Sequence, residues 1–292
     1  MNLTILYRGP LSSCNYGCTY CPFAKHAETS AERAADNAAL TRFVNWIKQQ
    51  SHIQFSLLFT PWGEALNRAR YQQAFIQLTN LPNVQKAAIQ TNLSCRLDWV
   101  AGCDKTKLGL WATYHPTQTD RQRFLAKCHS LLEHGVRFSV GVVGLKEHLS
   151  EIEALRYELP AQVYLWINAY KRKPTYYTAN ELQFLTTIDP LFPLNNQHYA
   201  SVGKPCRTGE TVISVDGDGT MRRCHFISTI IGNIYDPNFA TVLQPRPCSN
   251  QTCGCHIGYV HLEELRLDEV FGVGILERIP QSQPVAVYCS AL

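Results

Sequence analysis

The stretch that decides the fold is LTILYRGPLSSCNYGCTYCPF, residues 3–23. Its first six residues form a short apolar run that predicts a buried β-strand. Three cysteines follow in the next loop, Cys14, Cys18 and Cys21, with the spacing C-x3-C-x2-C. Thiolates bind soft metals, which are zinc, copper(I) and the iron of iron–sulfur clusters. The loop therefore predicts a metal site with three cysteine ligands, and it leaves the fourth ligand to be identified.

Two kinds of metal site are compatible with three cysteines. A closed structural zinc site needs a fourth protein ligand, and His26 is near enough in sequence to serve. A [4Fe–4S] cluster on three cysteines instead leaves one iron open, because each thiolate binds one iron. That open iron would bind an atom of a substrate or cofactor.

Short apolar runs alternate with helical patterns through the first 200 residues. The predicted strands are residues 3–8, 55–59, 86–92, 108–115, 137–144 and 163–170. Helical spacing of apolar residues predicts helices over residues 30–50, 69–78, 121–135, 146–159 and 179–188. Strand–helix units in succession predict an α/β fold with a parallel sheet and outer helices. Six units are fewer than the eight of a closed TIM barrel, so we expect a partial (β/α)6 barrel of the TIM type.

The pattern changes at residue 201, where cysteines become dense. Residues 210–224, ETVISVDGDGTMRRC, predict a hairpin, because an alternating strand pattern leads into the turn sequence DGDG. We therefore expect two units, residues 1–200 and a small cysteine-rich module over residues 201–292. This module contains five cysteines between residues 206 and 255, which are Cys206, Cys224, Cys248, Cys253 and Cys255, and a sixth, Cys289, near its end.

The first cysteine loop resembles the signature of the radical SAM superfamily, in which an aromatic residue, here Tyr20, precedes the last cysteine. The resemblance implies that Cys14, Cys18 and Cys21 hold a [4Fe–4S] cluster and that S-adenosylmethionine (SAM) is its fourth ligand. It also implies reductive cleavage of SAM to a 5′-deoxyadenosyl radical, which removes hydrogen from a substrate. Tyr20 would then lie beside the adenine.

The segment FTPWGEAL, residues 59–66, resembles the Gly-Gly-Glu-Pro segment of the same family. Gly63 and Glu64 match that segment, whereas Trp62 and Ala65 depart from it. The resemblance implies that Glu64 accepts a hydrogen bond from the SAM amino group, which is a charge-assisted contact. An ordinary loop after a strand is the alternative reading of this segment.

Two further strand ends resemble SAM-binding elements. IQTN, residues 89–92, is similar to the polar strand end that touches the ribose, which implies Gln90, Thr91 and Asn92 as contacts. SVGVVGLKE, residues 139–147, is similar to an element that flanks the adenine. Its matching residues are Val142, Gly144 and Glu147, and Val140 replaces the first glycine of the element.

Residues 206–224 resemble the first half of a SPASM or twitch module, which implies an auxiliary [4Fe–4S] cluster on Cys206, Cys224 and two later cysteines. Gly254 permits a tight turn, so we expect Cys253 and Cys255 rather than Cys248 to complete the set. A full SPASM module needs seven cysteines, so a twitch-like module with one cluster is expected. A structural zinc ribbon is the alternative.

Other candidates follow from position alone. Tyr114 and His115 end the fourth predicted strand and are expected to face the cavity, where His115 would contact SAM or substrate or donate a proton. Cys289 is a candidate hydrogen-atom donor, and a free thiol without such a role is the alternative.

Composition narrows the possible partners. The 292 residues carry a net charge of +4 with scattered basic residues, so we expect no nucleic-acid partner. No apolar run reaches the length of a membrane span, and the first residues lack the features of a secretory signal. We therefore expect an oxygen-sensitive cytoplasmic protein whose twelve cysteines stay reduced.

We thus expect a radical SAM enzyme that acts on a small molecule or peptide, with an electron donor such as flavodoxin or ferredoxin. The auxiliary cluster would transfer an electron or anchor the substrate. Two alternatives are a glycyl-radical activase that acts on a protein partner and a non-catalytic zinc or iron–sulfur protein.

Overall fold

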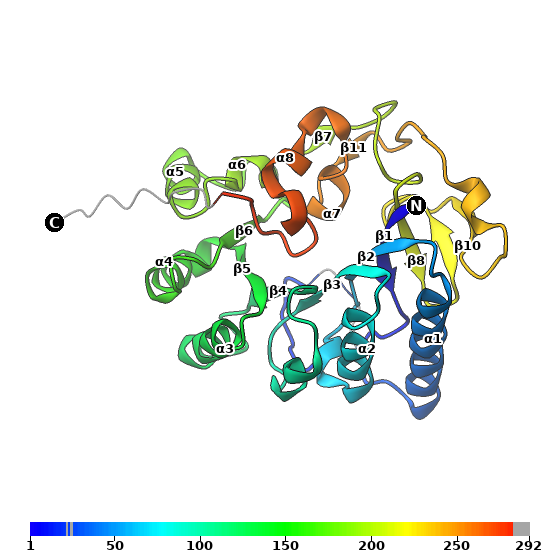
Figure 1. Ribbon diagram of the computed structural model, residues 1–292. Coiled ribbons are helices and arrows are strands. Elements are labelled where there is room, and N and C mark those ends of the chain that lie inside the picture. The colour runs from blue at the N-terminus through cyan, green and yellow to red at the C-terminus, as the bar shows by residue number, and fades with distance from the viewer. Residues whose placement is uncertain (22, 24–25, 283–292) are drawn as a thin grey trace.

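The computed structural model describes residues 1–21, 23 and 26–282 (Figure 1). Its strands are β1 (Asn2–Arg8), β2 (Gln54–Phe59), β3 (Val84–Thr91), β4 (Leu108–Tyr114), β5 (Arg137–Gly144), β6 (Leu165–Ala169), β7 (Tyr199–Ala200), β8 (Val212–Asp216), β9 (Thr220–Arg222), β10 (Ile230–Asn233) and β11 (Thr252–Cys253). Strands β1–β6 and β8–β10 form one nine-stranded sheet in the order β10-β9-β8-β1-β2-β3-β4-β5-β6, and β7 pairs with β11.

The first five helices lie where the apolar periodicity predicted them, and three short helices that it did not predict follow. They are α1 (Ser30–Gln49), α2 (Ala69–Thr79), α3 (Arg121–Glu133), α4 (Leu149–Glu158), α5 (Ala179–Ile188), α6 (Phe192–Asn195), α7 (His256–Tyr259) and α8 (Leu267–Phe271). Short 3-10 turns cover Ala65–Asn67, Asp98–Gly102, Lys146–His148, Phe239–Val242, Glu263–Leu265 and Gly272–Gly274. Among the helices of the described residues, none is both long enough and apolar enough to cross a membrane.

Strands β1 to β6 pair in chain order, and every one of these pairs is parallel. This is the mixed α/β architecture with a central parallel sheet that the sequence predicted. Parallel neighbours need a long crossover, which α1 to α4 provide between most of the strands. The carboxyl ends of the six strands therefore lie along one edge, where the first cysteine loop follows β1.

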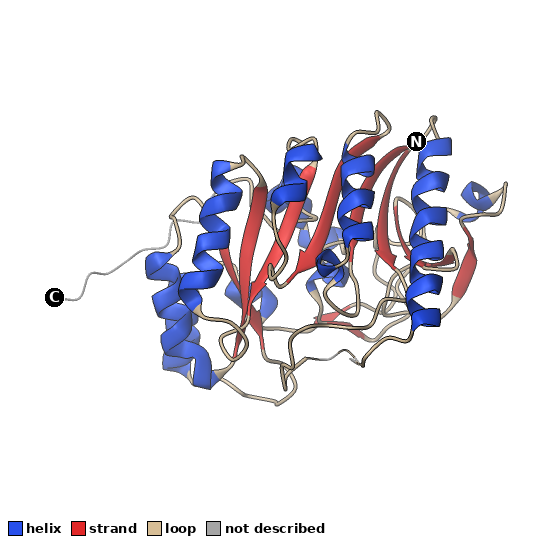
Figure 2. Cartoon of the chain, turned by 90° about the horizontal axis from the view of Figure 1, so that it is seen from below, coloured by secondary structure: helices blue, strands red, loops and turns tan. Residues whose placement is uncertain are grey.

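Side chains alternate between the two faces of the sheet. In β1, Leu3, Ile5 and Tyr7 pack into the large apolar cluster shared with α1 to α5, whereas Leu6 joins a second cluster with Trp111. Figure 2 shows the row of helices along one face. We call this the helix face and the opposite one the inner face.

The predicted hairpin is present, and it extends the main sheet. β8 and β9 are antiparallel, but β8 also pairs in parallel with β1, with Ile5 opposite Ile213. The hairpin thereby brings the second cysteine-rich segment against the first strand. Figure 1 shows this segment, from β7 to α8, beside the strands of the central sheet.

The chain after α8 covers the amino end of the inner face. Glu277 is fully buried there, and its Oε1 accepts hydrogen bonds from Lys86 at 2.7 Å and Arg137 at 3.1 Å. Gly109 leaves room for it, because a Cβ at residue 109 would lie 3.2 Å from the Glu277 side chain. Space for a ligand on the inner face therefore lies toward the carboxyl ends of the strands.

Candidate functional site

The first cysteine loop lies directly beyond the carboxyl end of β1. Cys18 is buried, and Cys14 and Cys21 are half-buried. The Cys21 N–H donates to the Cys18 carbonyl at 3.2 Å, which closes a tight turn between them. The C-x3-C-x2-C spacing therefore folds into a compact loop that can present three sulfurs on one surface.

Two buried carboxylates hold the chain that leads into this loop. Asp36 on α1 accepts a hydrogen bond from the Leu11 N–H at 3.1 Å, and Glu28 accepts one from the Ser12 N–H at 3.3 Å. Arg68 joins the loop to Glu28, because its Nη2 donates to the Ser13 hydroxyl and to Glu28, each at 2.9 Å. Backbone amides bound to carboxylates make strong hydrogen bonds, so the residues before Cys14 are fixed.

The loop after β2 touches the cysteine loop through Gly63. A Cβ at residue 63 would lie 1.8 Å from the carbonyl oxygen of Ser13, a distance that no side chain can occupy. The next residue completes the contact, because the Glu64 N–H donates to the same Ser13 oxygen at 3.0 Å. Glycine is thus required here for close approach of two backbones.

Glu64 is buried and accepts three hydrogen bonds from the chain. They come from the Asn92 N–H at 2.5 Å, the Thr91 hydroxyl at 2.8 Å and the Leu66 N–H at 3.2 Å. Burial raises the pKa of Glu64 to about 7, and these hydrogen bonds oppose the rise. Glu64 therefore ties the end of β3 to the cysteine loop.

Asn92 connects this network to a cysteine sulfur. Its Nδ2 lies 3.8 Å from the Cys14 sulfur and donates to Asn15 Oδ1 at 3.1 Å. The Tyr16 N–H donates to the same sulfur at 3.4 Å. Donors aimed at a sulfur favour its thiolate form, which is the form that binds metal. Gln90 precedes these residues on β3 and is half-buried.

Tyr20 and His115 contact each other, and His115 also contacts a cysteine of the loop. The Tyr20 hydroxyl is 2.8 Å from His115 Nδ1, and the two rings stack with centroids 5.9 Å apart. The Cys18 sulfur is 3.4 Å from the same His115 nitrogen. Burial raises the pKa of the Tyr20 phenol, which keeps it protonated. Position alone predicted His115 as a site residue, and the structure brings it against the cysteines.

The neighbouring Tyr114 does not face the cavity, so that expectation was wrong. It is buried in the helix-face cluster, where its ring packs on Phe124 and its hydroxyl donates to Glu151 at 3.1 Å. Successive strand residues point to opposite faces, and Tyr114 lies within β4 whereas His115 follows it. Sequence reasoning also missed Gln118, whose Oε1 accepts the Gly17 N–H at 2.7 Å.

The adenine candidates lie at the end of β5. Val142 is fully buried in the helix-face cluster, so only its backbone is available to a ligand. The Gly144 carbonyl accepts a hydrogen bond from the Tyr177 hydroxyl at 2.6 Å, and Glu147 is exposed. His26, the candidate zinc ligand, contacts Ser12 and Glu32 instead, with its Nε2 3.1 Å from the Glu32 carboxylate.

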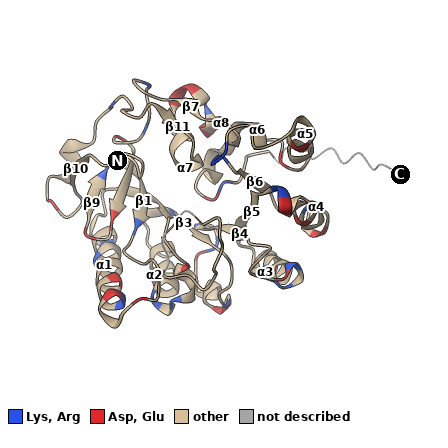
Figure 3. Ribbon diagram, turned by 180° about the vertical axis from the view of Figure 1, so that it is seen from behind, with Lys and Arg blue, Asp and Glu red and all other residues tan. Residues whose placement is uncertain are grey.

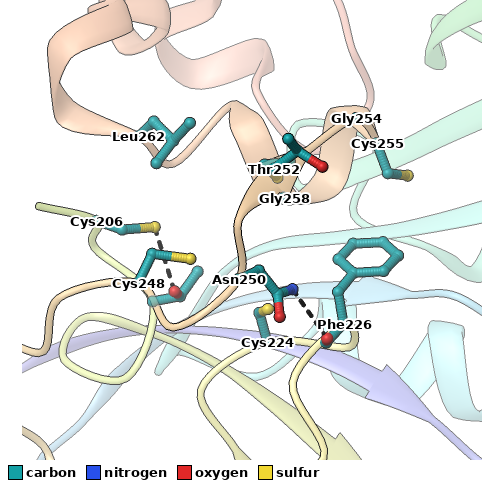
Figure 4. Close-up of a pocket in the computed structure, with 12 residues that line it drawn as sticks. Cys206, Cys224, Phe226, Cys248, Asn250, Thr252, Gly254, Cys255, Gly258 and Leu262 are labelled. Carbon is teal, nitrogen blue, oxygen red and sulfur yellow. Dashed lines mark hydrogen bonds between the residues drawn. The ribbon is translucent and has the colours of Figure 1, made fainter. Parts of the chain in front are cut away.

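The second cysteine set surrounds one pocket (Figure 4). The cysteines that line it are Cys206, Cys224, Cys248, Cys253 and Cys255. Gly258 makes room for one of them, because a Cβ at residue 258 would lie 2.8 Å from the Cys253 sulfur. The pocket thus combines five thiols from Cys206 to Cys255, 49 positions apart in the sequence, that the hairpin and α7 bring together.

The five thiols do not share one environment. Figure 4 shows Cys206, Cys224 and Cys248 on one side of the pocket, and Cys255 on the far side of the α7 turn with its sulfur directed away. Burial raises the pKa of Cys224 to about 11, with further contributions from Cys206 and Cys248. Burial also raises the pKa of Cys253 to about 12, and Cys224, Cys255 and Cys248 add to that rise. Cys224 therefore lies near Cys206, Cys248 and Cys253, and Cys255 lies near Cys253.

Within the described part of the chain, no three His, Cys, Asp or Glu side chains converge as the ligands of a single metal ion would. A [4Fe–4S] cluster makes a different demand, because each cysteine binds a separate iron. Cys289 lies outside the described residues.

Comparison with known proteins shows the fold. No family model matches the chain, and no curated protein matches its sequence. The structure of anSMEcpe with bound AdoMet and the Cp18Cys peptide matches with a TM-score of 0.52 and 16% identity, covering 82% of each chain. The structure of anSMEcpe with bound AdoMet and the Kp18Cys peptide gives 0.54 and 14%, again over 82% of each chain. The resemblance predicted from the cysteine motif is therefore confirmed at the level of the fold.

The contact between Gly63 and Ser13 leads to a stability prediction. Gly63→Ala should lower the free energy of unfolding by roughly 3 kcal/mol, because the new methyl group collides with a backbone carbonyl that cannot rotate away. Urea unfolding measures the change. Gly17→Ala is the matched control in the same loop, since the nearest atom to its Cβ would be 3.8 Å away. Equal losses in the two variants would contradict the steric account.

Glu64 leads to a prediction about pH. The unfolded carboxyl ionises near pH 4.5, whereas the folded one keeps its proton up to about pH 7. The unfolded state therefore binds fewer protons between these values, and stability falls as pH rises, by about 3 kcal/mol in all. Urea unfolding at several pH values should show this slope in the natural chain but not in Glu64→Gln. Parallel profiles would refute the assignment.

Proposed function

We propose that the chain is a radical SAM enzyme whose Cys14, Cys18 and Cys21 hold a [4Fe–4S] cluster. One observation carries the proposal: the three cysteines share one loop that is locked at the carboxyl end of β1, in a fold shared with a protein solved with bound AdoMet. When bound, cluster and SAM would supply reductive cleavage to a 5′-deoxyadenosyl radical, which takes hydrogen from the substrate. The residues of the chain would hold the cluster and SAM in place and shield them.

The residues around the loop would hold and shield that chemistry. The donors on Cys14, which are Asn92 Nδ2 and the Tyr16 N–H, favour a thiolate ligand. Tyr20 and His115 would form the wall beside the adenine. Gln90 and Asn92 would contact the ribose, and the backbone of Val142 and Gly144 would flank the adenine.

Glu64 has two possible tasks, and the structure supports one of them directly. Both of its carboxylate oxygens accept hydrogen bonds from the chain, so Glu64 positions Thr91 and Asn92 relative to the cysteines. Acceptance of a hydrogen bond from the SAM amino group is a further proposed task. A carboxylate oxygen has more than one lone pair, so the two tasks are compatible.

An auxiliary [4Fe–4S] cluster would be held by Cys206, Cys224, Cys248 and Cys253. This set differs from the one the sequence favoured, because Cys248 replaces Cys255. The support is that Cys224 interacts with Cys206, Cys248 and Cys253. All five cysteines line the pocket, but Figure 4 shows the Cys255 sulfur directed away from those of Cys206, Cys224 and Cys248. Residues 201–292 would thus form the auxiliary-cluster unit after a SAM-binding unit of residues 1–200.

The substrate would be a small molecule or a peptide. The anSMEcpe structure with the Cp18Cys peptide supports the view that this fold accommodates a peptide. The enzyme would need one-electron reduction of its cluster, and a flavodoxin or ferredoxin is the donor we propose. The auxiliary cluster would move an electron to or from the substrate or anchor it.

Anaerobic reconstitution tests the proposed function. We expect roughly eight irons per chain, and 5′-deoxyadenosine from SAM when a reductant is added. Cys14→Ala should abolish that product, whereas Cys128→Ala, which removes a buried thiol on α3, should not. Bound zinc without SAM cleavage would overturn the proposal in favour of a non-catalytic protein. A glycyl-radical signal on an added protein would replace the small-molecule or peptide substrate by a protein partner, as in an activase.

The auxiliary ligand set has its own test in a matched pair of variants. Cys248→Ala should lose about four irons per chain, because one ligand of the auxiliary cluster is missing. Cys255→Ala should keep them, and both variants should still cleave SAM. Iron analysis together with the 5′-deoxyadenosine assay measures both quantities. Loss of iron in Cys255→Ala, with full iron in Cys248→Ala, would restore the set expected from the sequence.

A further inference from the structure

Tyr20 is held by residues that follow three neighbouring strands. His115, after β4, stacks on its ring and has its Nδ1 2.8 Å from its hydroxyl. His148, after β5, packs against the same ring in a T-shaped arrangement, with ring centroids 5.8 Å apart. Arg172, after β6, donates from Nη2 to the Tyr20 carbonyl at 3.2 Å. Figure 3 shows β4, β5 and β6 side by side, so three adjacent strand ends converge on one residue of the first cysteine loop.

The position of His148 is fixed by the turn after β5. The Leu145 N–H donates to the Val143 carbonyl at 2.8 Å, and the His148 N–H donates to the Leu145 carbonyl at 2.9 Å. His148 is also the N-cap residue of α4, which begins at Leu149. Because only 5% of its surface is exposed, its ring has little freedom to turn away from Tyr20.

One ring nitrogen of His148 lacks a partner. Its Nδ1 is buried, and no group within the described residues forms a hydrogen bond with it. Buried polar atoms in folded proteins are nearly always paired, because burial removes their hydration. A neutral imidazole has one nitrogen that donates and one that accepts, and here the buried one has neither kind of contact. The nitrogen therefore calls for a partner that the chain does not itself supply.

Two other buried histidines of the described residues have an unpaired nitrogen, at His256 Nε2 and His261 Nδ1. Both belong to the segment of α7, and the His256 ring packs against those of Trp111 and Phe271. Of these three histidines, His148 is the one whose ring meets the first cysteine loop. Its unpaired nitrogen is thus placed beside the loop for which a bound cosubstrate is proposed.

We propose that His148 is a specificity-determining residue for SAM, whose Nδ1 accepts a hydrogen bond from the 6-amino group of the adenine. The inference rests on the proposed function, because it extends the wall that Tyr20 and His115 would form beside the adenine. His148 would be neutral and carry its proton on Nε2. A base without that amino group would leave a buried nitrogen unpaired, and a site of this kind rejects such a ligand.

A pair of ligands tests the proposal through binding rather than through activity. They are S-adenosylhomocysteine and its analogue in which hydrogen replaces the 6-amino group of the base. Both keep the amino and carboxylate groups that would bind the open iron, and neither has the sulfonium that reduction would cleave. Calorimetric titration of the reconstituted full chain without oxygen gives a dissociation constant for each ligand. The ratio of the two constants isolates the contribution of the 6-amino group.

We expect the natural chain to bind S-adenosylhomocysteine roughly tenfold more tightly than the analogue. His148→Phe keeps an aromatic ring against Tyr20 but removes the nitrogen, so the two constants should become nearly equal through weaker binding of S-adenosylhomocysteine. His148→Asn restores an acceptor near the position of Nδ1 and should recover part of the ratio. His129→Phe is the matched control, because it makes the same change at an exposed position of α3 and should leave the ratio intact.

Two outcomes in His148→Phe would overturn the inference. One is an unchanged ratio, and the other is an equal loss of affinity for both ligands, which would show that His148 only supports Tyr20. If His148→Phe does not fold in urea controls, His148→Gln replaces it, because its amide lies one bond farther out than Nδ1 and should also lose the ratio. The natural chain tests the proposed function separately. Absence of binding of both ligands would contradict the SAM site itself, whereas equal binding of both would contradict only the role of His148.

Discussion

The close approach of Gly63 to the Ser13 carbonyl is the constraint on which the site depends. It brings the loop after β2 against the loop after β1 at a distance that no side chain allows. Glu64 can then donate its N–H to Ser13 while its carboxylate accepts the Asn92 N–H. Three successive strand ends are thereby joined into one rigid edge. A cysteine loop attached to that edge has little freedom, which favours preorganised metal binding.

The parallel pairing of β8 with β1 has a comparable effect on the second cysteine set. Once the hairpin extends the sheet, the chain after β9 must cross the inner face, where His225 meets Thr60. The segment after α7 then returns beneath the same face and places Glu277 and Arg278 among the strands. Segments far apart in the sequence thus meet on the inner face of the sheet.

Much of the candidate site could be predicted because its signals are local. The C-x3-C-x2-C spacing, a glycine–glutamate pair after a strand and a histidine at a strand end each depend on a few consecutive residues. The direction of Tyr114 could not be predicted, because the strand ends one residue before His115 and the faces alternate. The choice between Cys248 and Cys255 could not be settled from the sequence for a different reason, since it depends on how α7 orients the chain.

The sequence by itself determined the elements of the parallel sheet, the first cysteine loop and the presence of a second cysteine set, because periodicity and spacing are properties of the local chain. Only the tertiary structure decided that the hairpin joins β1, that Glu64 ties the end of β3 to the cysteine loop, and that Glu277 is buried against Lys86 and Arg137. Those features arise from contacts between residues far apart in the sequence, such as the pairing of Ile5 with Ile213. Long-range packing and the pairing of buried charges leave no local signature from which they could be derived.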